Sequence, residues 1–343
     1  SDGKTTTTTI IAGLLEAAGR RVHLGGNIGH PLLTEVDSIA PGDVAVVELS
    51  SFQLMDMDRS PHIAVLTNLS PNHLDVHKDY AEYIQAKTNI FRHQSPVDRA
   101  VFNLDNAETR RLSRQAVGRC FGFTREEVPE RGTYLSAGYP GDHIWMVNDR
   151  GHRAVLSLDA IRLPGWHNVE NYMAAIAAVD GLVPNEAIAD FAAHFQGVEH
   201  RIELVRTLRG VRYYNDSIAS SPARTIAGLR CFPEKVILMA GGKDKGIPYD
   251  ELGPEILAHV KSLVLCGATA GKIREAVERA PGYTPGCLEI QETGDFAEAV
   301  GLCAQRAGEG DVVLLSPAST SFDRFANFME RGNTFKRLVN ELT

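Results

Sequence analysis

Apolar runs alternate with amphipathic stretches along the first half of the chain. Residues 80–91 have the apolar spacing of a helix, and short apolar runs typical of buried strands cover residues 44–49, 63–68 and 100–103. This alternation is typical of a doubly wound parallel sheet with helices on both faces. Short β-like pieces with glycine turns follow over residues 119–160 and predict an antiparallel patch attached to that sheet. The Ala-rich residues 168–179 predict a further helix.

The second half of the chain repeats the pattern. Residues 222–229 are predicted to be helical, and strand-like runs cover residues 211–215, 236–240, 262–266 and 311–316. Polar residues follow the ends of these runs, where α/β folds place their ligands, so the series predicts a Rossmann-like C-terminal domain. We place the boundary near residues 197–198, which gives domains 1–197 and 198–343.

A short phosphate-binding signature opens the chain. Gly3-Lys4-Thr5-Thr6 precedes apolar residues at helical spacing, as in the second half of a P-loop that enters its helix. In such a loop backbone N–H groups hold nucleotide phosphates, Lys4 reaches the β/γ-phosphates and Thr5 ligates Mg²⁺. An ordinary helix start with a Ser or Asp cap is the alternative. The upstream glycine and strand of a P-loop are not in the sequence. We therefore expect a P-loop ATPase-type domain without its first strand, within a longer protein.

Composition narrows the possible partners. The 343 residues are 43% hydrophobic and 23% charged, as in a soluble globular protein, and the net charge of −8 comes without a basic tract. Nucleic acid is therefore not an expected partner. With no signal peptide or long apolar run, we expect a cytoplasmic protein without a membrane partner. We also expect a monomer that acts on small molecules. Its five cysteines lack C-x-x-C spacing and are expected to be reduced thiols.

Three residues of the first domain are candidates for metal chemistry. Glu48 ends a predicted strand, where an acid is a natural partner for Mg²⁺, although a solvated carboxylate is the alternative. His73 follows the next strand and could bind a metal or steer a substrate, whereas a lone His is more often structural. Lys87 lies on the next predicted helix, and the residues around it indicate only a solvated surface charge.

Other polar residues suit a nucleotide. Asn168 and Asn171 stand one helical turn apart and could bind an adenine or a phosphate, or simply cap the helix. Arg201 and Asp216 open the second domain. An Arg for phosphate and an Asp for a ribose hydroxyl would suit a nucleotide held between two domains.

Several of these motifs occur together in one known family. They are GKTT at 3–6, GNIG at 26–29, VELSSFQL at 47–54, NHLD at 72–75, LPG with HN at 163–168, HR at 200–201, NDS at 215–217, and SPA through RGN at 316–333. Their identity and order resemble the Mur ligase family along the whole chain. The resemblance covers the family's central ATPase domain and its C-terminal domain. The family's N-terminal domain, which holds the UDP moiety, has no counterpart in this sequence.

The resemblance implies an activity and a set of roles. It implies an ATP-dependent amide ligase that adds D-glutamate to UDP-N-acetylmuramoyl-L-alanine, through an acyl phosphate, in peptidoglycan precursor synthesis. It implies two Mg²⁺ sites, with Thr5 and Glu48 at one, and with His73 and a carbamylated Lys87 at the other. Contacts to ATP are implied for Gly3, Lys4, Thr5, Thr6, Asn168, Asn171, Arg201 and Asp216. Contacts to the amide-forming substrates are implied for Asn27, His73, Ser220, Lys245, Ser321, Phe322 and Phe328.

The sequence departs from the family pattern after Asp216. The motif often reads NDSKAT, whereas Ile218 and Ser220 stand here in place of the Lys and Thr. One cation near the incoming amino acid is thereby lost, and Lys243 or Lys245 is the candidate to take its place.

Three other interpretations come from different classes. A P-loop kinase or NTPase switch would need no second nucleotide-contacting unit. A non-catalytic module could still bind ATP or D-glutamate, and without the upstream strand and the UDP-binding region we expect this chain alone to be inactive as a ligase. A sister ligase that adds L-alanine, a diamino acid or a dipeptide is the third, and the stretch after Asn215 looks least like those.

Overall fold

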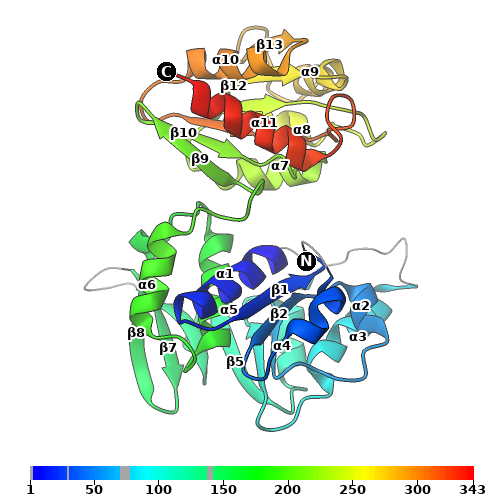
Figure 1. The fold of residues 1–343 in the computed structure, drawn as a ribbon. Coiled ribbons are helices and arrows are strands. Elements are labelled where there is room, and N and C mark those ends of the chain that lie inside the picture. Colours follow the sequence, from blue (N-terminus) through cyan, green and yellow to red (C-terminus); the bar gives the residue numbers. More distant parts are fainter. Residues whose placement is uncertain (1–2, 29–30, 70–77, 137–141) are drawn as a thin grey trace. The chain divides into compact units, whose positions relative to one another are not determined.

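The computed structural model describes residues 3–28, 31–69, 78–136 and 142–343. The chain forms two compact units (Figure 1). One consists of Ser1–Arg162 with Trp166–Phe195, and the other of Leu163–Gly165 with Gln196–Thr343.

The first unit contains two sheets. A two-stranded parallel sheet consists of β1 (Val22–Gly26) and β2 (Val44–Glu48), and a six-stranded sheet has the order β3-β4-β5-β6-β7-β8. The strands of the larger sheet are β3 (Ile63–Leu66), β4 (Arg99–Asn103), β5 (Arg119–Thr124), β6 (Gly132–Ser136), β7 (His143–Asn148) and β8 (Gly151–Ser157). Pairing is parallel from β3 to β6 and antiparallel from β6 to β8. The predicted antiparallel patch is therefore correct only from β6 onward, because β5 joins the parallel part.

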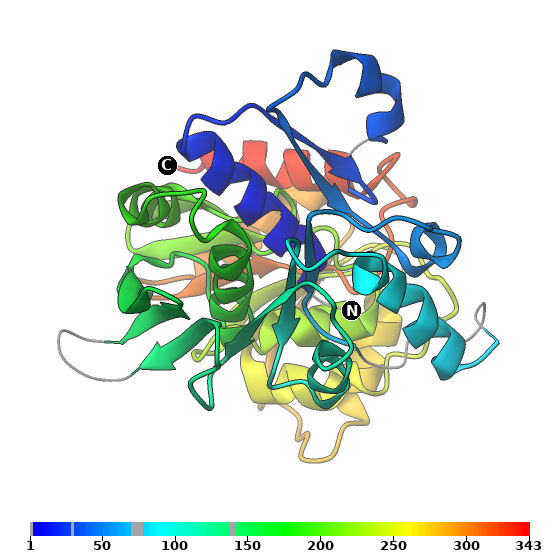
Figure 2. The same ribbon diagram turned by 90° about the horizontal axis from the view of Figure 1, so that it is seen from below.

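Helices cover both faces of the larger sheet. On one face α5 (Trp166–Val179) packs against β3 to β6, and α1 (Lys4–Ala17) packs on α5 and on β1 and β2, as Figures 1 and 2 show. On the other face α3 (Tyr80–Arg92) and α4 (Ala107–Ser113) lie against β3 and β4. The remaining elements are η1 (Leu32–Ser38), α2 (Ser51–Met55), η2 (Leu158–Ala160) and α6 (Asn185–His194).

The alternation of side chains along β3 explains this layering. Ala64 and Leu66 pack in one buried cluster with Tyr83 and Phe91 of α3, whereas Ile63 and Val65 face the cluster that contains α1 and α5. Successive side chains of a strand point to opposite faces, so an unbroken apolar run fits a strand buried on both sides.

The second unit is a single six-stranded sheet with the order β13-β12-β11-β14-β10-β9. Its strands are β9 (Glu203–Leu208), β10 (Val211–Asn215), β11 (Val236–Ala240), β12 (Val260–Cys266), β13 (Glu289–Thr293) and β14 (Val312–Leu315). All neighbouring pairs are parallel except β9 with β10, and neither β9 nor β13 was predicted from the sequence. The strand order reverses at β14, which is the position where open α/β sheets bind ligands.

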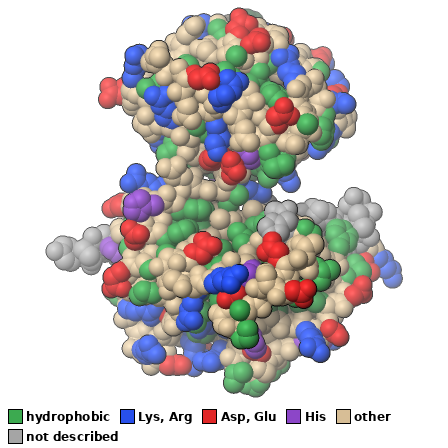
Figure 3. Space-filling view, viewed as in Figure 1, with side chains coloured by type: hydrophobic (Ala, Val, Ile, Leu, Met, Phe, Trp, Pro, Cys, Tyr) green, Lys and Arg blue, Asp and Glu red, His purple; other side chains and the backbone are tan. Residues whose placement is uncertain are grey.

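Five helices enclose this sheet. Side chains of α7 (Pro222–Leu229), α8 (Leu252–His259) and α9 (Ala270–Glu278) share one core cluster with Leu238 and Leu314, and those of α10 (Phe296–Arg306) and α11 (Phe328–Glu341) share another with Ile237 and Val313. Acidic and basic side chains are interspersed over the face of each unit drawn in Figure 3. None of the helices among the described residues has the length and apolarity needed to cross a membrane.

Candidate active site

The start of α1 requires a glycine. Gly3, the N-cap of the helix, has a φ of 85°, and a Cβ atom there would lie 2.4 Å from the Oδ1 atom of Asn171. A helix N-terminus presents unpaired N–H groups and the positive end of the helix dipole, which together favour an anion. The left-handed glycine followed by Lys4 and Thr5 is thus the local geometry that a phosphate-binding helix start needs.

A buried carboxylate lies beside this helix start. Glu48, the last residue of β2, is 4% exposed, and its Oε2 atom accepts a hydrogen bond of 2.7 Å from the Thr5 hydroxyl. Its Oε1 atom accepts a bond of 3.0 Å from the Nδ2 group of Asn27, which follows β1. A hydroxyl and a carboxylate held this close are hard oxygen ligands of the kind that Mg²⁺ prefers. Thr5, Glu48 and Asn27 thus lie together, while the roles predicted for them toward Mg²⁺ and the substrate stay predictions.

Lys87 is buried, which its own sequence context did not indicate. The side chain on α3 is 7% exposed, and its Nζ atom lies 3.5 Å from the carbonyl oxygen of Leu49. Burial, followed by the positive charge of Lys4, lowers the pKa of Lys87 to about 8, while Glu48 acts in the opposite direction. Lys87 therefore belongs to the same electrostatic site as Lys4 and Glu48.

Asn168 and Asn171 brace the helix start from α5. The Asn171 Oδ1 atom accepts a hydrogen bond of 3.1 Å from the hydroxyl of Thr7, and the Asn171 Nδ2 group donates one of 3.2 Å to the Oδ1 atom of Asn168. Both asparagines are buried, as is Thr6. Asn171 thus lies directly beneath Gly3, and Asn168 is its hydrogen-bond partner.

His73 lies outside the described residues, so its place at the metal site stays a prediction. Within residues 3–28, 31–69, 78–136 and 142–343, no three His, Cys, Asp or Glu side chains form a cluster that could hold a metal ion. Among the described residues, the Thr5 hydroxyl and the Asn27 amide donate to Glu48.

In the second unit, Asp216 occupies a buried position just after β10. It is 4% exposed, and its Oδ2 atom accepts a hydrogen bond of 2.8 Å from the Ser316 hydroxyl. Burial raises the pKa of Asp216 to about 7, against the effects of the Ser316 hydrogen bond and the Arg201 charge. Arg201 and Asp216 therefore interact electrostatically, and their contact with a nucleotide stays a prediction.

The residues predicted to bind the incoming amino acid lie on loops that follow neighbouring strands. The loop after β11 is joined to the loop after β14, because the N–H group of Lys243 donates to the carbonyl of Thr320 at 2.8 Å. Ser321 follows this bridge and is buried, whereas Phe322 is 61% exposed. Lys245 is exposed two residues past Lys243.

Ser220 and Phe328 border the loop after β10. Ser220 is half-buried, and its N–H group donates to the carbonyl of Ile218 at 2.8 Å. The carbonyl of Phe328, in the first turn of α11, accepts a hydrogen bond of 2.8 Å from the hydroxyl of Ser217.

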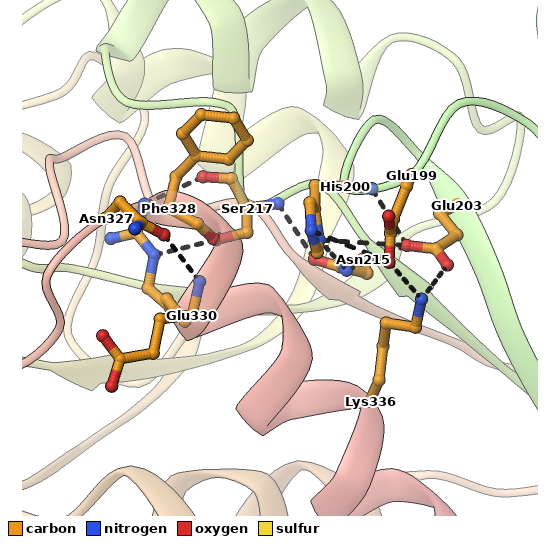
Figure 4. Close-up of polar contacts among 10 residues, drawn as sticks. Glu199, His200, Glu203, Asn215, Ser217, Asn327, Phe328, Glu330 and Lys336 are labelled. Carbon is orange, nitrogen blue, oxygen red and sulfur yellow. Dashed lines mark hydrogen bonds and ion pairs between the residues drawn. The ribbon is translucent and has the colours of Figure 1, made fainter. Parts of the chain in front are cut away.

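Figure 4 shows a cluster that the sequence did not predict. His200 has a positive φ of 64°, is buried, and lies with its Nδ1 atom 2.9 Å from the Nδ2 atom of Asn215. Its ring meets that of Phe328 edge-on at 5.8 Å. Lys336 of α11 pairs with Glu199 at 2.9 Å and with Glu203 at 2.6 Å. This cluster fixes the segment that leads into Arg201.

The first unit has a helix start suited to phosphate and a buried acid beside Thr5. Together with the Rossmann-like second unit, these features define a nucleotide-using α/β enzyme of two domains. The model of the Mur ligase middle domain matches residues 1–179, and that of the Mur ligase glutamate ligase domain matches residues 200–319. The chain therefore belongs to the Mur ligase family and is an ATP-dependent ligase of peptidoglycan synthesis.

Individual relatives match the whole chain. The UDP-N-acetylmuramoylalanine–D-glutamate ligase of Acetivibrio thermocellus is 51% identical over 346 residues, covering 100% of this chain and 73% of that protein. The enzyme of the same name from Symbiobacterium thermophilum is 50% identical, with 100% and 74% covered.

Solved structures confirm the fold. A UDP-N-acetylmuramoyl-L-alanyl-D-glutamate–2,6-diaminopimelate ligase has a TM-score of 0.68 at 21% identity, covering 100% of this chain and 78% of that one. The MurF ligase of Thermotoga maritima in complex with ADP also has a TM-score of 0.68, at 20% identity, with 99% and 79% covered.

Proposed function

We propose that this enzyme joins D-glutamate to UDP-N-acetylmuramoyl-L-alanine at the expense of ATP. The names of the relatives that match the whole chain at about half identity support this substrate pair. The observation that carries the mechanism is the buried Glu48 carboxylate, held by Thr5 and Asn27 at the N-terminus of α1. Such a site suits the phosphates of ATP and the cation that accompanies them.

The reaction proceeds in two steps. A carboxylate oxygen of the alanyl end attacks the γ-phosphorus of ATP, the bond from that phosphorus to the β,γ-bridging oxygen breaks, and ADP leaves. The amine of D-glutamate attacks the resulting acyl phosphate at its carbonyl carbon and loses a proton. The bond from that carbon to the phosphate oxygen then breaks, and the products are an amide and inorganic phosphate.

The first unit holds the polyphosphate. The N–H groups at the start of α1, from Gly3 to Thr6, face the phosphates, and the Lys4 ammonium neutralises the charge that develops on them. Thr5 and Glu48 would hold one Mg²⁺, and His73 and Lys87 a second. Mg²⁺ held by these residues would offset the repulsion between a carboxylate and a polyphosphate. Asn168 and Asn171 would contact ATP, and Asn27 and His73 the muramoyl-alanine part.

Lys87 would act as a carbamate. An ammonium group at this buried position opposes a cation, whereas a carbamate is an anion with oxygen ligands of the kind that Mg²⁺ prefers. The lowered pKa of Lys87, about 8, favours the neutral amine that reacts with CO₂.

The second unit supplies the incoming amino acid. Arg201 and Asp216 would contact ATP, and the pocket for D-glutamate would consist of Ser220, Lys245, Ser321, Phe322 and Phe328. Lys245 is the cation proposed to pair with a glutamate carboxylate. It would also compensate for Ile218, which stands where the family often has a lysine. We place the domain boundary near residues 197–198 and propose a monomer that works in the cytoplasm, where ATP and UDP-linked precursors are made.

An amino-acid panel tests the proposal. The full-length enzyme with ATP and UDP-N-acetylmuramoyl-L-alanine should release phosphate with D-glutamate, and not with L-alanine, a diamino acid or a D-alanyl dipeptide. Lys4→Ala should abolish turnover, whereas Lys261→Ala, which changes an exposed lysine paired with Asp311, should leave it unchanged. Turnover with one of the other amino acids would identify a sister ligase instead.

A further inference from the structure

Helix α11 carries a buried arginine. The residues of this polar helix that face the sheet are Arg331, Gly332, Phe335 and Val339. Arg331 is 2% exposed and heads the largest fully buried side chains among the described residues. A guanidinium taken out of water is costly unless its donors are satisfied, so its partners indicate its purpose.

Those partners are two serines that follow different strands. The Nε group donates to the hydroxyl of Ser217 at 3.0 Å, and one terminal nitrogen donates to the carbonyl of Ser217 at 2.9 Å. The other terminal nitrogen donates to the carbonyl of Ser319 at 3.1 Å. Ser217 follows β10 and Ser319 follows β14. A planar fork of fixed geometry thus ties together the ends of two neighbouring strands.

Ser319 extends the connection to a third strand. Its hydroxyl lies 2.8 Å from the Tyr249 hydroxyl and 2.8 Å from that of Thr269. The Thr269 hydroxyl accepts a hydrogen bond of 3.1 Å from the N–H group of Gly242, just after β11. A Cβ atom on Gly242 would lie 3.1 Å from a terminal nitrogen of Arg331, so the guanidinium packs against this backbone as well.

The three tied loops are those proposed to receive the amino acid. Ser220 lies three residues after Ser217, Ser321 two residues after Ser319, and Lys245 three residues after Gly242. We propose that Arg331 is a positioning residue for the amino-acid pocket, because its guanidinium sets the spacing of the loops that carry these side chains. This inference rests on the proposed function for the location of the pocket. Arg331 touches no reacting atom, and it acts through Ser217 and Ser319.

The spacing of the buried residues along α11 argues against a role for Arg331 in packing alone. Phe335 and Val339 supply the buried apolar side chains of α11, and an apolar residue at position 331 would continue that stripe. Such a residue would leave both serine carbonyls without the donors they now have. The arginine therefore serves the polar loops and not the core.

The test compares Arg331→Lys with Arg337→Lys in the full-length enzyme. Arg337 lies on the same helix, is exposed and pairs with Glu341. A lysine keeps the charge at position 331 but cannot bridge both serines, and each lost hydrogen bond is worth roughly 2–10-fold. We expect Arg331→Lys to raise the KM for D-glutamate about 10-fold and that for ATP less than about 3-fold. Arg337→Lys should change neither.

A milder variant guards against loss of folding. Ser217→Ala removes the hydroxyl that accepts from Arg331 and donates to the carbonyl of Phe328, and it should raise the KM for D-glutamate about 3-fold with the same selectivity. If the KM for D-glutamate rises no more than that for ATP in both variants, Arg331 is only structural and the proposal is overturned. If the wild-type enzyme accepts a different amino acid, the proposed function fails, and the same KM comparison with that amino acid still tests Arg331.

Discussion

The buried position of Lys87 leads to a quantitative prediction about its carbamylation. Only the neutral amine reacts with CO₂. With a pKa of about 8, roughly a quarter of Lys87 is neutral at pH 7.5, against about 0.1% for an ordinary lysine with a pKa near 10.5. The buried environment therefore raises the reactive fraction by about 200-fold. The physical cause is desolvation by the packing of α3, reinforced by the charge of Lys4.

This prediction sets the pH dependence of reactivation. The full-length enzyme is first freed of CO₂ at low pH and then returned to buffers of different pH at one concentration of dissolved CO₂. Recovery of ligase activity should accelerate about tenfold per pH unit below pH 8 and level off above it, because the amine is then already neutral. Isotope-labelled CO₂ should give one protected carbamate signal by NMR.

Two variants complete the test. Lys87→Ala should lose activity and regain part of it with a short carboxylate that fills the vacated space. Lys78→Ala, which changes an exposed lysine just before the same helix, should behave as wild type. Full activity of Lys87→Ala without added carboxylate would refute the reasoning. So would a reactivation rate that keeps rising about tenfold per unit from pH 8 to 10, since an unshifted lysine behaves in that way.

Three further predictions concern the second unit. The folded-state pKa of Asp216 is about 7, which is above its unfolded value of 3.8. The protonated carboxyl therefore favours the folded state, and this contribution to stability is fully present below pH 3.8 and is lost as the pH rises through 7. Asp216→Asn should remove that pH dependence and make the unit more stable at pH 8 by at most about 4 kcal/mol, as measured by urea unfolding across pH. A Cβ at Gly332 would lie 2.2 Å from the Nδ1 atom of His200, so Gly332→Ala should destabilise the unit by about 1–3 kcal/mol, whereas Gly301→Ala on α10, with no atom within 4 Å, should not. Lys245→Ala should raise the KM for D-glutamate far more than that for ATP, and an unchanged KM for D-glutamate would move the carboxylate partner to another cation.

Local patterns predicted most of the regular elements. The apolar runs at 236–240 and 63–66 are strands buried on both faces, and the amphipathic stretch at 80–91 is the helix α3. These features depend on side-chain periodicity, which the chain itself displays. The edge strand β9 is half-buried along most of its length, so it carries no comparable apolar signal, and it was missed.

Some features of the candidate site likewise followed from local motifs, whereas others did not. Thr5 and Glu48, which the motifs assign to one Mg²⁺ site, are joined by a hydrogen bond, and their role as metal ligands stays a prediction. The burial of Lys87 could not be predicted from its neighbours, because it depends on how α3 packs against α2 and β3. Arg331 was quoted only as part of a motif. Its place on the buried face of α11 was a usable signal, but one of its serine partners, Ser217, lies 114 residues away in the sequence.

The central claim is that ATP activates the carboxylate of the alanyl substrate. The most direct measurement uses UDP-N-acetylmuramoyl-L-alanine with heavy oxygen in that carboxylate, together with ATP, D-glutamate and the full-length enzyme. The account predicts that one heavy oxygen atom appears in each phosphate released, because the carboxylate oxygen stays on phosphorus when the amide forms. Phosphate without the label, formed in step with the amide, would contradict the acyl phosphate and with it the proposed mechanism.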